Sequence, residues 1–368
     1  MEKRVFVVGA GPIGLMLAKE LAGMGVDVTV FDSKKRVSDN TAKASGIFSR
    51  AGLSRLGIDR AHSFVNELDG AVLHAGEETF RVETKEPVAY ILDRGKFAES
   101  CKKLAEDAGA KIVLGKRFDK AELLELQKDG PCIIVGADGA VSTVASVFGF
   151  PHISEYVLTY KAEYENVDIR DPHKVELFFS KKIANRFFVW TAPYSKSKLE
   201  VGVGISGRSR RNSLSVFETF ASIPYMRSVL RGSKKAAGYA SMIPLEPRKK
   251  TVIGNVLLVG DAAGQVKATT GGGIIFGGAC AKVAARAISA NIKGGVPLSR
   301  YEKDWRKLYG LDLKMHRIIH AYYSSLGDRS FGTILKTAKI LGFEKFLSTH
   351  GDMDRPSLVV KRMIFRGA

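Results

Sequence analysis

Three glycines near the amino terminus have a spacing that can bind phosphate. Gly9, Gly11 and Gly14 form the pattern G-x-G-x-x-G, with Pro12 between the last two. The first glycine of this pattern allows a tight turn, the second lets the backbone approach a pyrophosphate, and the third allows close helix-strand packing. Asp32 follows Gly14 by 18 residues, where a carboxylate accepts hydrogen bonds from ribose hydroxyls. We therefore expect these five residues to bind a dinucleotide.

The elements around these glycines must form a strand, a turn and a helix. Residues 3–8 are rich in β-branched and aromatic side chains and predict a buried parallel strand. A helix is expected through about residue 24, and a second strand over 26–31 leads to Asp32. The amino end of that helix offers unpaired N–H groups and the positive end of a dipole to the phosphates.

Two later segments repeat the theme of a buried strand that runs into a turn. Residues 132–135 precede Asp138 and Gly139, and residues 256–259 precede Gly260, Asp261 and Gly264. The second turn continues to Gly271, Gly272, Gly273 and Ile274, where a helix rich in small residues begins.

These extra turns favour FAD over a nicotinamide cofactor as the resident group. NAD needs only the first cradle, whereas an extended FAD also needs ligands for its ribityl chain and ring. We expect Asp261 to bind a ribityl hydroxyl and the 271–273 backbone to contact the flavin. The helix that follows would stabilise the negative charge of the reduced ring with its positive end.

The chain resembles the FAD-dependent hydroxylases and reductases of the p-hydroxybenzoate hydroxylase type. Asp138-Gly139 looks like their Asp-Gly motif, and Gly260-Asp261 looks like their Gly-Asp motif. Residues 91–94 (Ile-Leu-Asp-Arg) are similar to the family's strand-end arginine, which implies that Arg94 reaches the cofactor. Ala145 stands near the place where many hydroxylases carry arginine, which is a departure.

Within that superfamily the sequence is most similar to the archaeal geranylgeranyl reductases. Residues 259–274 carry the resemblance, with Gly264 where hydroxylases favour histidine and Ala268 in place of the reductases' proline. Phe188, Trp190 and Pro193, followed by Gly202 and Gly204, are similar to the family's Tyr-x-Trp-x-Phe-Pro and Gly-x-Gly motifs, although Phe188 and Ala192 depart from them. Residues 350–356 look like the family's carboxy-terminal region. A cysteine that some members carry near the flavin is absent from residues 42–47.

This resemblance implies an FAD-dependent reductase that saturates C=C bonds of an isoprenoid (geranylgeranyl) lipid in lipid biosynthesis. The substrate would be an isoprenoid lipid or a prenyl diphosphate, held in a cavity with Trp190, Phe188 and Pro193. NAD(P)H or a reduced electron carrier would supply electrons. Three alternatives stay open: an FAD-dependent monooxygenase of a small aromatic, a non-catalytic or electron-transferring flavoprotein, and a plain NAD-dependent dehydrogenase.

Composition and charge limit the partners. The formal net charge is +19, which favours polyanions, but the basic residues are spread along the chain and carry no nucleic-acid-binding motif. Two interpretations of this charge stay open. One is peripheral contact with an anionic membrane, in which residues 359–366 would take part, and the other is an ordinary lysine-rich surface in contact with solvent. The three cysteines have no metal-ligand spacing, and each is expected to be a small buried side chain. With no apolar run of about 18 residues, we expect a cytoplasmic protein.

The predicted fold class is α/β. A Rossmann-like FAD-binding domain comprises residues 1–60, 88–155 and 245–298. An inserted antiparallel β-sheet substrate domain comprises 61–87 and 156–244, and residues 299–368 form a helical carboxy-terminal region.

Overall fold

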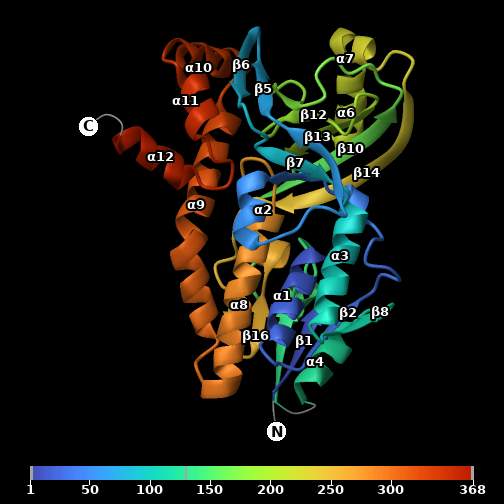
Figure 1. Ribbon diagram of the computed structural model, residues 1–368, viewed down its shortest axis with the longest axis vertical. Helices are drawn as coiled ribbons and strands as arrows, with labels where there is room; N and C mark the ends of the chain where they lie inside the picture. Colours follow the sequence, from blue (N-terminus) through green and yellow to red (C-terminus); the bar gives the residue numbers. More distant parts are fainter. Residues whose placement is uncertain (1–2, 129–130, 366–368) are drawn as a thin grey trace. The chain divides into compact units, whose positions relative to one another are not determined.

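The computed structural model describes residues 3–128 and 131–365. The chain divides into two compact units, each built from three separate segments (Figure 1). Unit 1 comprises residues 1–42, 94–154 and 244–314, and unit 2 comprises 43–93, 155–243 and 315–368. The domain limits expected from the sequence stay a prediction.

Unit 1 contains a sheet with helices on both faces, parallel except for its edge strand β15. Its strands are β1 (Arg4–Val8), β2 (Val28–Asp32), β8 (Lys111–Leu114), β9 (Cys132–Gly136), β15 (Val252–Ile253) and β16 (Val256–Leu258). Its helices are α1 (Pro12–Gly23), α3 (Arg94–Asp107), α4 (Lys120–Lys128), α5 (Thr143–Val147) and α8 (Ile274–Gly294), and the 3-10 turn η2 is Gly260–Ala263. The helix α9 (Ser299–Ser325) begins in this unit, and the first segment of the unit stops within the turn η1 (Thr41–Lys43).

The strand order of this sheet, β15-β16-β9-β1-β2-β8, creates a switch point between β1 and β9. From β1 the chain proceeds outward to β2 and β8, and then returns to β9 and β16 on the other side, all in parallel. Ligands of open α/β sheets bind outside the carboxyl ends of the strands at such a point. The ends of β1, β9 and β16 therefore lie side by side where a dinucleotide is expected.

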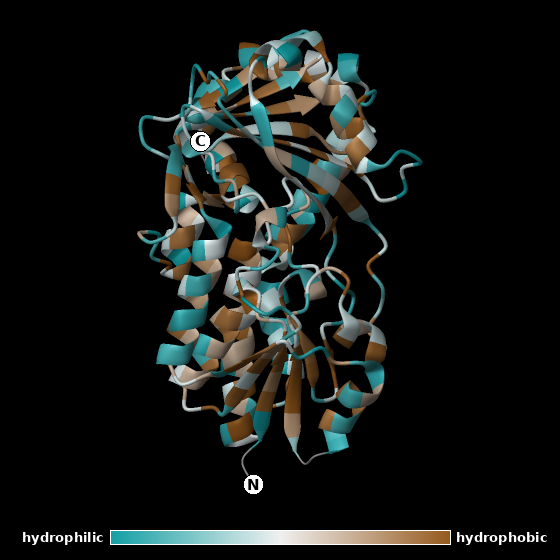
Figure 2. Cartoon of the chain, turned by 90° about the vertical axis from the view of Figure 1, so that its right-hand side faces the viewer, coloured by the Kyte–Doolittle hydropathy of each residue, from teal (hydrophilic) through white to brown (hydrophobic). Residues whose placement is uncertain are grey.

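Burial on both faces explains the composition of these strands. Val5 and Val7 of β1 are fully buried on the side of α1, while Phe6 joins a cluster with Ile134, Val144 and residues of α4 and α5. The strands of the sheet accordingly appear largely in the colour of hydrophobic residues (Figure 2). The second predicted strand is observed two residues later than expected, so that Asp32 is its last residue.

Unit 2 is built on a mixed seven-stranded sheet and a smaller three-stranded one. The large sheet has the order β14-β10-β13-β12-β11-β5-β6, and the small one has β3-β7-β4. The strands are β3 (Ile47–Ser49), β4 (Phe64–Leu68), β5 (Gly70–Ala75), β6 (Glu78–Glu83), β7 (Ala89–Leu92), β10 (Tyr156–Glu165), β11 (Lys174–Phe179), β12 (Val189–Pro193), β13 (Lys198–Ser206) and β14 (Lys234–Pro244). The helices are α2 (Arg50–Leu56), α6 (Ser213–Ala221), α7 (Pro224–Val229), α10 (Asp328–Ile340), α11 (Phe343–His350) and α12 (Pro356–Phe365).

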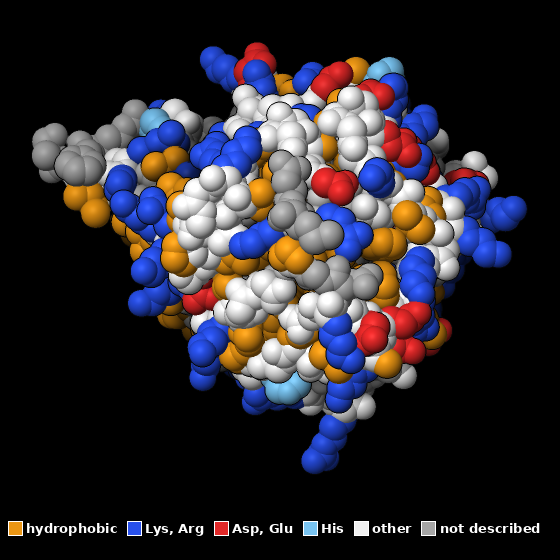
Figure 3. Space-filling model, turned by 90° about the horizontal axis from the view of Figure 1, so that it is seen from below, with side chains coloured by type: hydrophobic (Ala, Val, Ile, Leu, Met, Phe, Trp, Pro, Cys, Tyr) orange, Lys and Arg blue, Asp and Glu red, His pale blue; other side chains and the backbone are white. Residues whose placement is uncertain are grey.

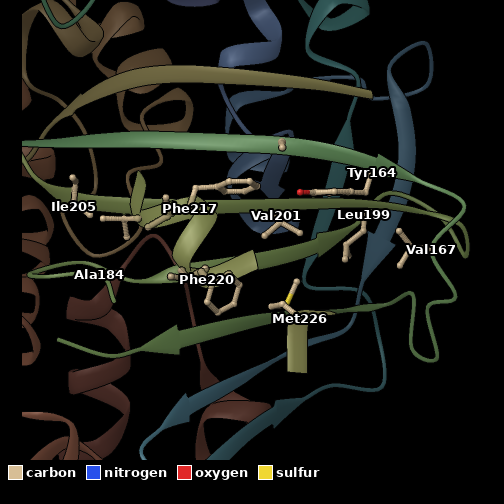
Figure 4. Packing of buried hydrophobic residues seen from close by; sticks show 13 residues of the cluster. Tyr164, Val167, Ala184, Leu199, Val201, Ile205, Phe217, Phe220 and Met226 are labelled. Atoms are coloured by element: carbon tan, nitrogen blue, oxygen red, sulfur yellow. The ribbon is translucent and has the colours of Figure 1, made fainter. Parts of the chain in front are cut away.

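Strict alternation along β13 separates the two faces of the large sheet. Leu199, Val201, Val203 and Ile205 point into a core closed by Phe217 and Phe220 of α6 and Met226 of α7 (Figure 4). The residues between them, including Glu200, Gly202 and Gly204, lie on the opposite face because successive side chains of a strand alternate. That face carries the tryptophan motif and meets residues of the small sheet.

The tail motif anchors the last helix to α2. The carboxylate of Asp354 is fully buried; it accepts a hydrogen bond from the Ser49 hydroxyl and pairs with Arg55 at 3.0 Å. Arg55 also pairs with Asp352 at 2.9 Å. Burial alone would raise the pKa of Asp352, but the bonds from Arg55 and from backbone N–H groups hold that pKa below its usual value. The carboxy-terminal region 350–356, which resembles that of the reductases, therefore anchors α12 in this structure.

Replacing the buried tail carboxylate should release α12. Asp354→Ala leaves the Ser49 hydroxyl and part of the Arg55 charge without a partner, which costs about 2 kcal/mol of local stability. We expect amide hydrogen exchange in residues 356–364 to accelerate by roughly 30-fold. The control Asp107→Ala removes an exposed i,i+4 pair with Lys103 and should leave this exchange unchanged. Unaltered exchange in Asp354→Ala would contradict the anchoring role.

Candidate functional site

The first glycine turn is forced by contacts between backbones at the switch point. Gly9 has φ +112°, and a Cβ there would lie 2.4 Å from the carbonyl oxygen of Ala137, which follows β9. A Cβ on Gly14 would lie 2.0 Å from the carbonyl oxygen of Gly9. Gly11 has no neighbour within 4 Å of its Cβ position, so its backbone is open to a ligand. Pro12 begins α1, whose N-cap makes no side-chain hydrogen bond.

Asp32 is bonded to this same turn. Its carboxylate accepts hydrogen bonds from the N–H groups of Ala10 at 2.7 Å and Lys34 at 2.9 Å, and the Lys34 ammonium lies 3.6 Å away. The acid at the end of β2 therefore helps to set the shape of the glycine turn, beside the ribose contact expected from the sequence.

Asp138 orders the second turn. Its half-buried carboxylate accepts bonds from the Ser142 hydroxyl at 2.6 Å and the Val144 N–H at 3.1 Å, at the start of α5. Burial raises the pKa of Asp138, and these two bonds oppose that rise. Gly139 has φ +84° and open space at its Cβ position. Both oxygens of Asp138 are thus engaged within the turn, which leaves the backbone around Gly139 as the part of the motif that is open.

The third turn is supported by a buried polar chain that the sequence analysis missed. The Gly260 N–H donates to the side-chain oxygen of Gln265 at 2.9 Å, and the Gln265 amide donates to the Tyr301 hydroxyl at 2.8 Å. Tyr301 in turn donates to the carbonyl of Leu258 in β16 at 2.8 Å. All these side-chain groups are buried, so the chain fixes the Gly-Asp turn against its own strand. A polar residue inside an apolar turn was the only sequence signal for Gln265.

Asp261 lies against the start of α8. Its Oδ1 atom is 2.6 Å from the place that a Cβ on Gly273 would take, and Gly273 is the N-cap of α8. Burial raises the pKa of Asp261, whereas the positive charge of Arg94 opposes this rise. Arg94 is the first residue of α3, in the same unit as Asp261. The predicted arginine and the predicted ribityl ligand therefore share one electrostatic environment.

The start of α8 has the properties of an anion-binding helix end. Gly273 makes no side-chain cap, and α8 continues for 21 residues, packed closely on α1 through Gly277. Gly264 adopts φ +70°, and a Cβ there would lie 2.0 Å from the carbonyl oxygen of Glu246. A histidine at this position, as in hydroxylases, would be strained. Two uncapped helix ends and three glycine turns in one unit fit an extended flavin dinucleotide.

In unit 2, Trp190 packs across a glycine of the neighbouring strand. Trp190 and Gly202 are paired in β12 and β13, and a Cβ on Gly202 would lie 2.1 Å from the indole Cζ2. The indole N–H donates to Glu200 at 2.8 Å. Gly204 makes the same kind of room for Phe187, at 2.2 Å. The Gly-x-Gly motif thus exists to admit aromatic rings onto this face of the sheet.

Phe188 and Pro193, which were also predicted to line the substrate cavity, are more buried than Trp190. Phe188 is buried and stacks on Phe187 with ring centroids 4.2 Å apart. Pro193 is buried at the end of β12, and its carbonyl accepts a hydrogen bond from Asn66 at 2.8 Å. A pocket of about 280 Å³, which includes open solvent, is lined by Phe179, Phe187, Tyr323, Phe331, Lys181 and Arg186 among others, and neither Phe188 nor Pro193 is one of its lining residues.

A buried ion pair lies beneath Trp190. Glu200 is completely buried and pairs with the equally buried ammonium of Lys161 at 2.5 Å. The same carboxylate accepts bonds from Trp190, from the Ser45 hydroxyl, and from the Tyr194 hydroxyl at 3.1 Å. Burial and, as the second cause, the negative charge of Glu200 raise the pKa of Tyr194 well above its usual value. The Tyr194 hydroxyl therefore keeps its proton. Neither Glu200 nor Lys161 was a sequence candidate, because they are distant in the chain.

This network holds three consecutive residues of the segment before β3. Lys161 donates to the carbonyl of Ala44 at 3.3 Å, Ser45 bonds to Glu200, and the Gly46 N–H donates to the Tyr194 hydroxyl at 3.3 Å. The segment in which some reductases carry a cysteine is therefore fixed to the sheet by the Glu200 centre.

Thiol and metal chemistry find little support in the described part of the chain. Cys101, Cys132 and Cys280 are all buried, as predicted, and burial raises the pKa of the Cys101 thiol to about 12. Between residues 3 and 365, apart from 129–130, no group of three or more His, Cys, Asp or Glu side chains is arranged to hold a metal. Among these same residues, no helix combines the length and apolar character needed to cross a membrane.

A side chain at the third glycine of the first turn should weaken cofactor binding. Gly14→Ala would push a methyl group into the Gly9 carbonyl, and because backbone cannot give way easily, we expect FAD to bind at least tenfold more weakly. Gly23→Ala, at the open end of the same helix, has no neighbour within 4 Å and should bind FAD normally. Flavin fluorescence titration of the apoprotein measures both. Equal affinities in the two variants would contradict this turn as the cradle.

Comparison with known proteins supports the geometry. The FAD binding domain family matches residues 2–81. An uncharacterised protein of Methanocaldococcus jannaschii is 27% identical, covering 97% of this chain and 94% of its own length. Digeranylgeranylglycerophospholipid reductase of Methanosarcina acetivorans is 29% identical, covering 92% of this chain and 89% of that protein.

The fold is also that of a solved structure. A geranylgeranyl bacteriochlorophyll reductase-like protein from Thermoplasma acidophilum has a TM-score of 0.79 at 19% identity, covering 98% of this chain and 95% of that one. The predicted α/β fold, the FAD cofactor and the resemblance to geranylgeranyl reductases are thus confirmed. The chain is an FAD-dependent oxidoreductase related to the archaeal geranylgeranyl reductases.

Proposed function

We propose that this protein saturates C=C bonds of an isoprenoid lipid. The relatives that match it over most of its length are named digeranylgeranylglycerophospholipid reductases, and lipids of this kind carry isolated double bonds. The observation that carries the proposal is the Trp190 face of the large sheet, where an indole is seated on Gly202 above a buried ion pair.

The chemistry divides between the cofactor and the protein. Bound FAD, once reduced, would supply a hydride to one alkene carbon, while the other carbon takes a proton. An isolated alkene develops no oxyanion for the protein to stabilise, so orientation and exclusion of water must contribute most of the rate. The chain offers apolar and aromatic residues for this purpose, among them Trp190, Phe188 and Phe187. NAD(P)H or a reduced electron carrier is the proposed electron donor.

Two positions weigh against a monooxygenase. A side chain at Gly264 would collide with the Glu246 carbonyl, which argues against the histidine of hydroxylases. Ala145 is buried in the cluster formed with Ile134, Val144 and Leu258, where a long charged side chain has no room. The features that hydroxylases use at these places are therefore sterically disfavoured here.

Reduction of a prenyl lipid tests the proposal. Dithionite-reduced holoprotein, mixed anaerobically with a digeranylgeranyl glycerophospholipid, should reoxidise while mass spectrometry detects two added hydrogens for each bond. Gly202→Val displaces Trp190, and we expect reoxidation to slow by tenfold or more with an unchanged flavin spectrum. Gly310→Ala in α9, whose Cβ position meets only an ordinary contact at 3.7 Å, is the matched control. A holoprotein that saturates no prenyl lipid would refute the function.

We further propose a peripheral contact with anionic lipid through α12. This helix exposes Val360, Met363 and Ile364 together with the basic Lys361 and Arg362. Arg366, part of the predicted contact, lies outside the described residues. Lys and Arg are spread over the surface seen in Figure 3, in keeping with the net charge of +19. An apolar face beside cations suits the boundary between headgroups and acyl chains.

Vesicle sedimentation tests this contact. We expect the wild-type protein to bind phosphatidylglycerol vesicles and the double variant Met363→Asp and Ile364→Asp to bind them at least tenfold more weakly. Val141→Asp changes an even more exposed apolar residue, in the turn before α5, and serves as the control. Unchanged vesicle binding by the double variant, or a change in its oligomeric state alone, would overturn the lipid contact.

A further inference from the structure

Lys267 is a buried cation in the loop that leads into α8. It lies between η2 and the Gly271–Gly273 run, and only 5% of it is exposed. Removing an ammonium from water costs several kcal/mol unless the site offers compensation. Its burial therefore places a cation beside the threonines and glycines of this loop.

The loop closes on itself around Lys267. The Lys267 N–H donates to the Gly272 carbonyl at 3.1 Å, and its own carbonyl accepts from the Gly271 N–H at 2.7 Å. The side chain returns along the same residues, because a Cβ on Gly272 would lie 2.9 Å from Cε and 3.4 Å from Nζ. The ammonium is thus held against the backbone that is expected to contact the flavin.

The surrounding charges make this corner of unit 1 electropositive. The uncapped amino end of α8 carries the positive end of the helix dipole. Arg94 acts electrostatically on Asp261, and Asp261 lies against the Gly273 position, so this carboxyl faces one cationic side chain and a helix end. The loop can therefore accept a further negative charge.

We infer that Lys267 sets the reduction potential of the bound FAD by stabilising its two-electron reduced ring. Reduction adds two electrons and one proton, which goes to N5, and leaves a net negative charge near N1. A fixed ammonium in a dry site favours that charged form over the neutral oxidised ring. Lys267 thereby determines how readily the cofactor accepts electrons and how strongly it gives hydride. This role rests on FAD binding and is independent of which lipid is reduced.

Dye-equilibrated reduction of the holoprotein measures the effect. Lys267→Met should lower the ratio of reduced to oxidised FAD at a fixed potential by about tenfold, which for a two-electron couple is a shift of about 30 mV. Lys267→Arg keeps the charge and should restore most of the ratio. Lys293→Met removes a lysine at the far end of the same helix, about 30 Å away, and should leave the potential unchanged.

Sulfite provides a second readout that needs neither turnover nor lipid. It adds to the oxidised ring and leaves it negatively charged, so its affinity should fall about tenfold in Lys267→Met and recover in Lys267→Arg. If Lys267→Met binds FAD weakly, excess FAD and the neutral but polar variant Lys267→Gln keep both measurements accessible. Potentials and sulfite affinities that are equal in wild type, Lys267→Met and Lys267→Gln would overturn the inference. Failure to saturate lipids, with these shifts present, would count against the proposed substrate alone.

Discussion

Contact between main chains at the switch point of the parallel sheet is the constraint on which the cofactor site depends. The turn after β1 touches the turn after β9 through Gly9 and Ala137, and the first turn of α1 rests on the carbonyl of Gly9 through Gly14. Any side chain at either glycine would separate these backbones. Because they meet without side chains between them, N–H groups from several segments become available to one elongated ligand.

Buried polar groups fix the Gly-Asp turn and the surroundings of Trp190. Gln265 and Tyr301 tie the Gly-Asp turn to β16, and Glu200 with Lys161 ties Trp190 and residues 44–46 to the large sheet. A buried carboxylate is costly unless its oxygens are satisfied, and here each oxygen of Glu200 receives two donors. Such a centre specifies a single arrangement of the groups around it.

Departures from the reductase motifs have local explanations. Ala192, where the family has phenylalanine, is completely buried among Leu68, Ala89 and Ile91, so the small sheet occupies the space that a larger ring would need. Ala268 is likewise buried, in the loop beside Lys267. The ring of Phe188 packs against the rings of Phe187 and Phe179. These substitutions alter the packing of the sheet face and leave the glycine turns intact.

The sequence by itself determined the class of fold, the cofactor and the three turns that we expect to bind it, because glycine spacing and the ends of strands are local properties of the chain. It also singled out Trp190, Gly202 and the carboxy-terminal motif, but it did not show that Trp190 packs on Gly202 or that this motif anchors α12. Only the tertiary structure decided that Asp354 anchors α12, and that Glu200, Lys161, Gln265 and Lys267 are buried. Those residues look like ordinary polar positions in the chain, since burial and pairing arise between segments tens to hundreds of residues apart, where no local pattern can record them.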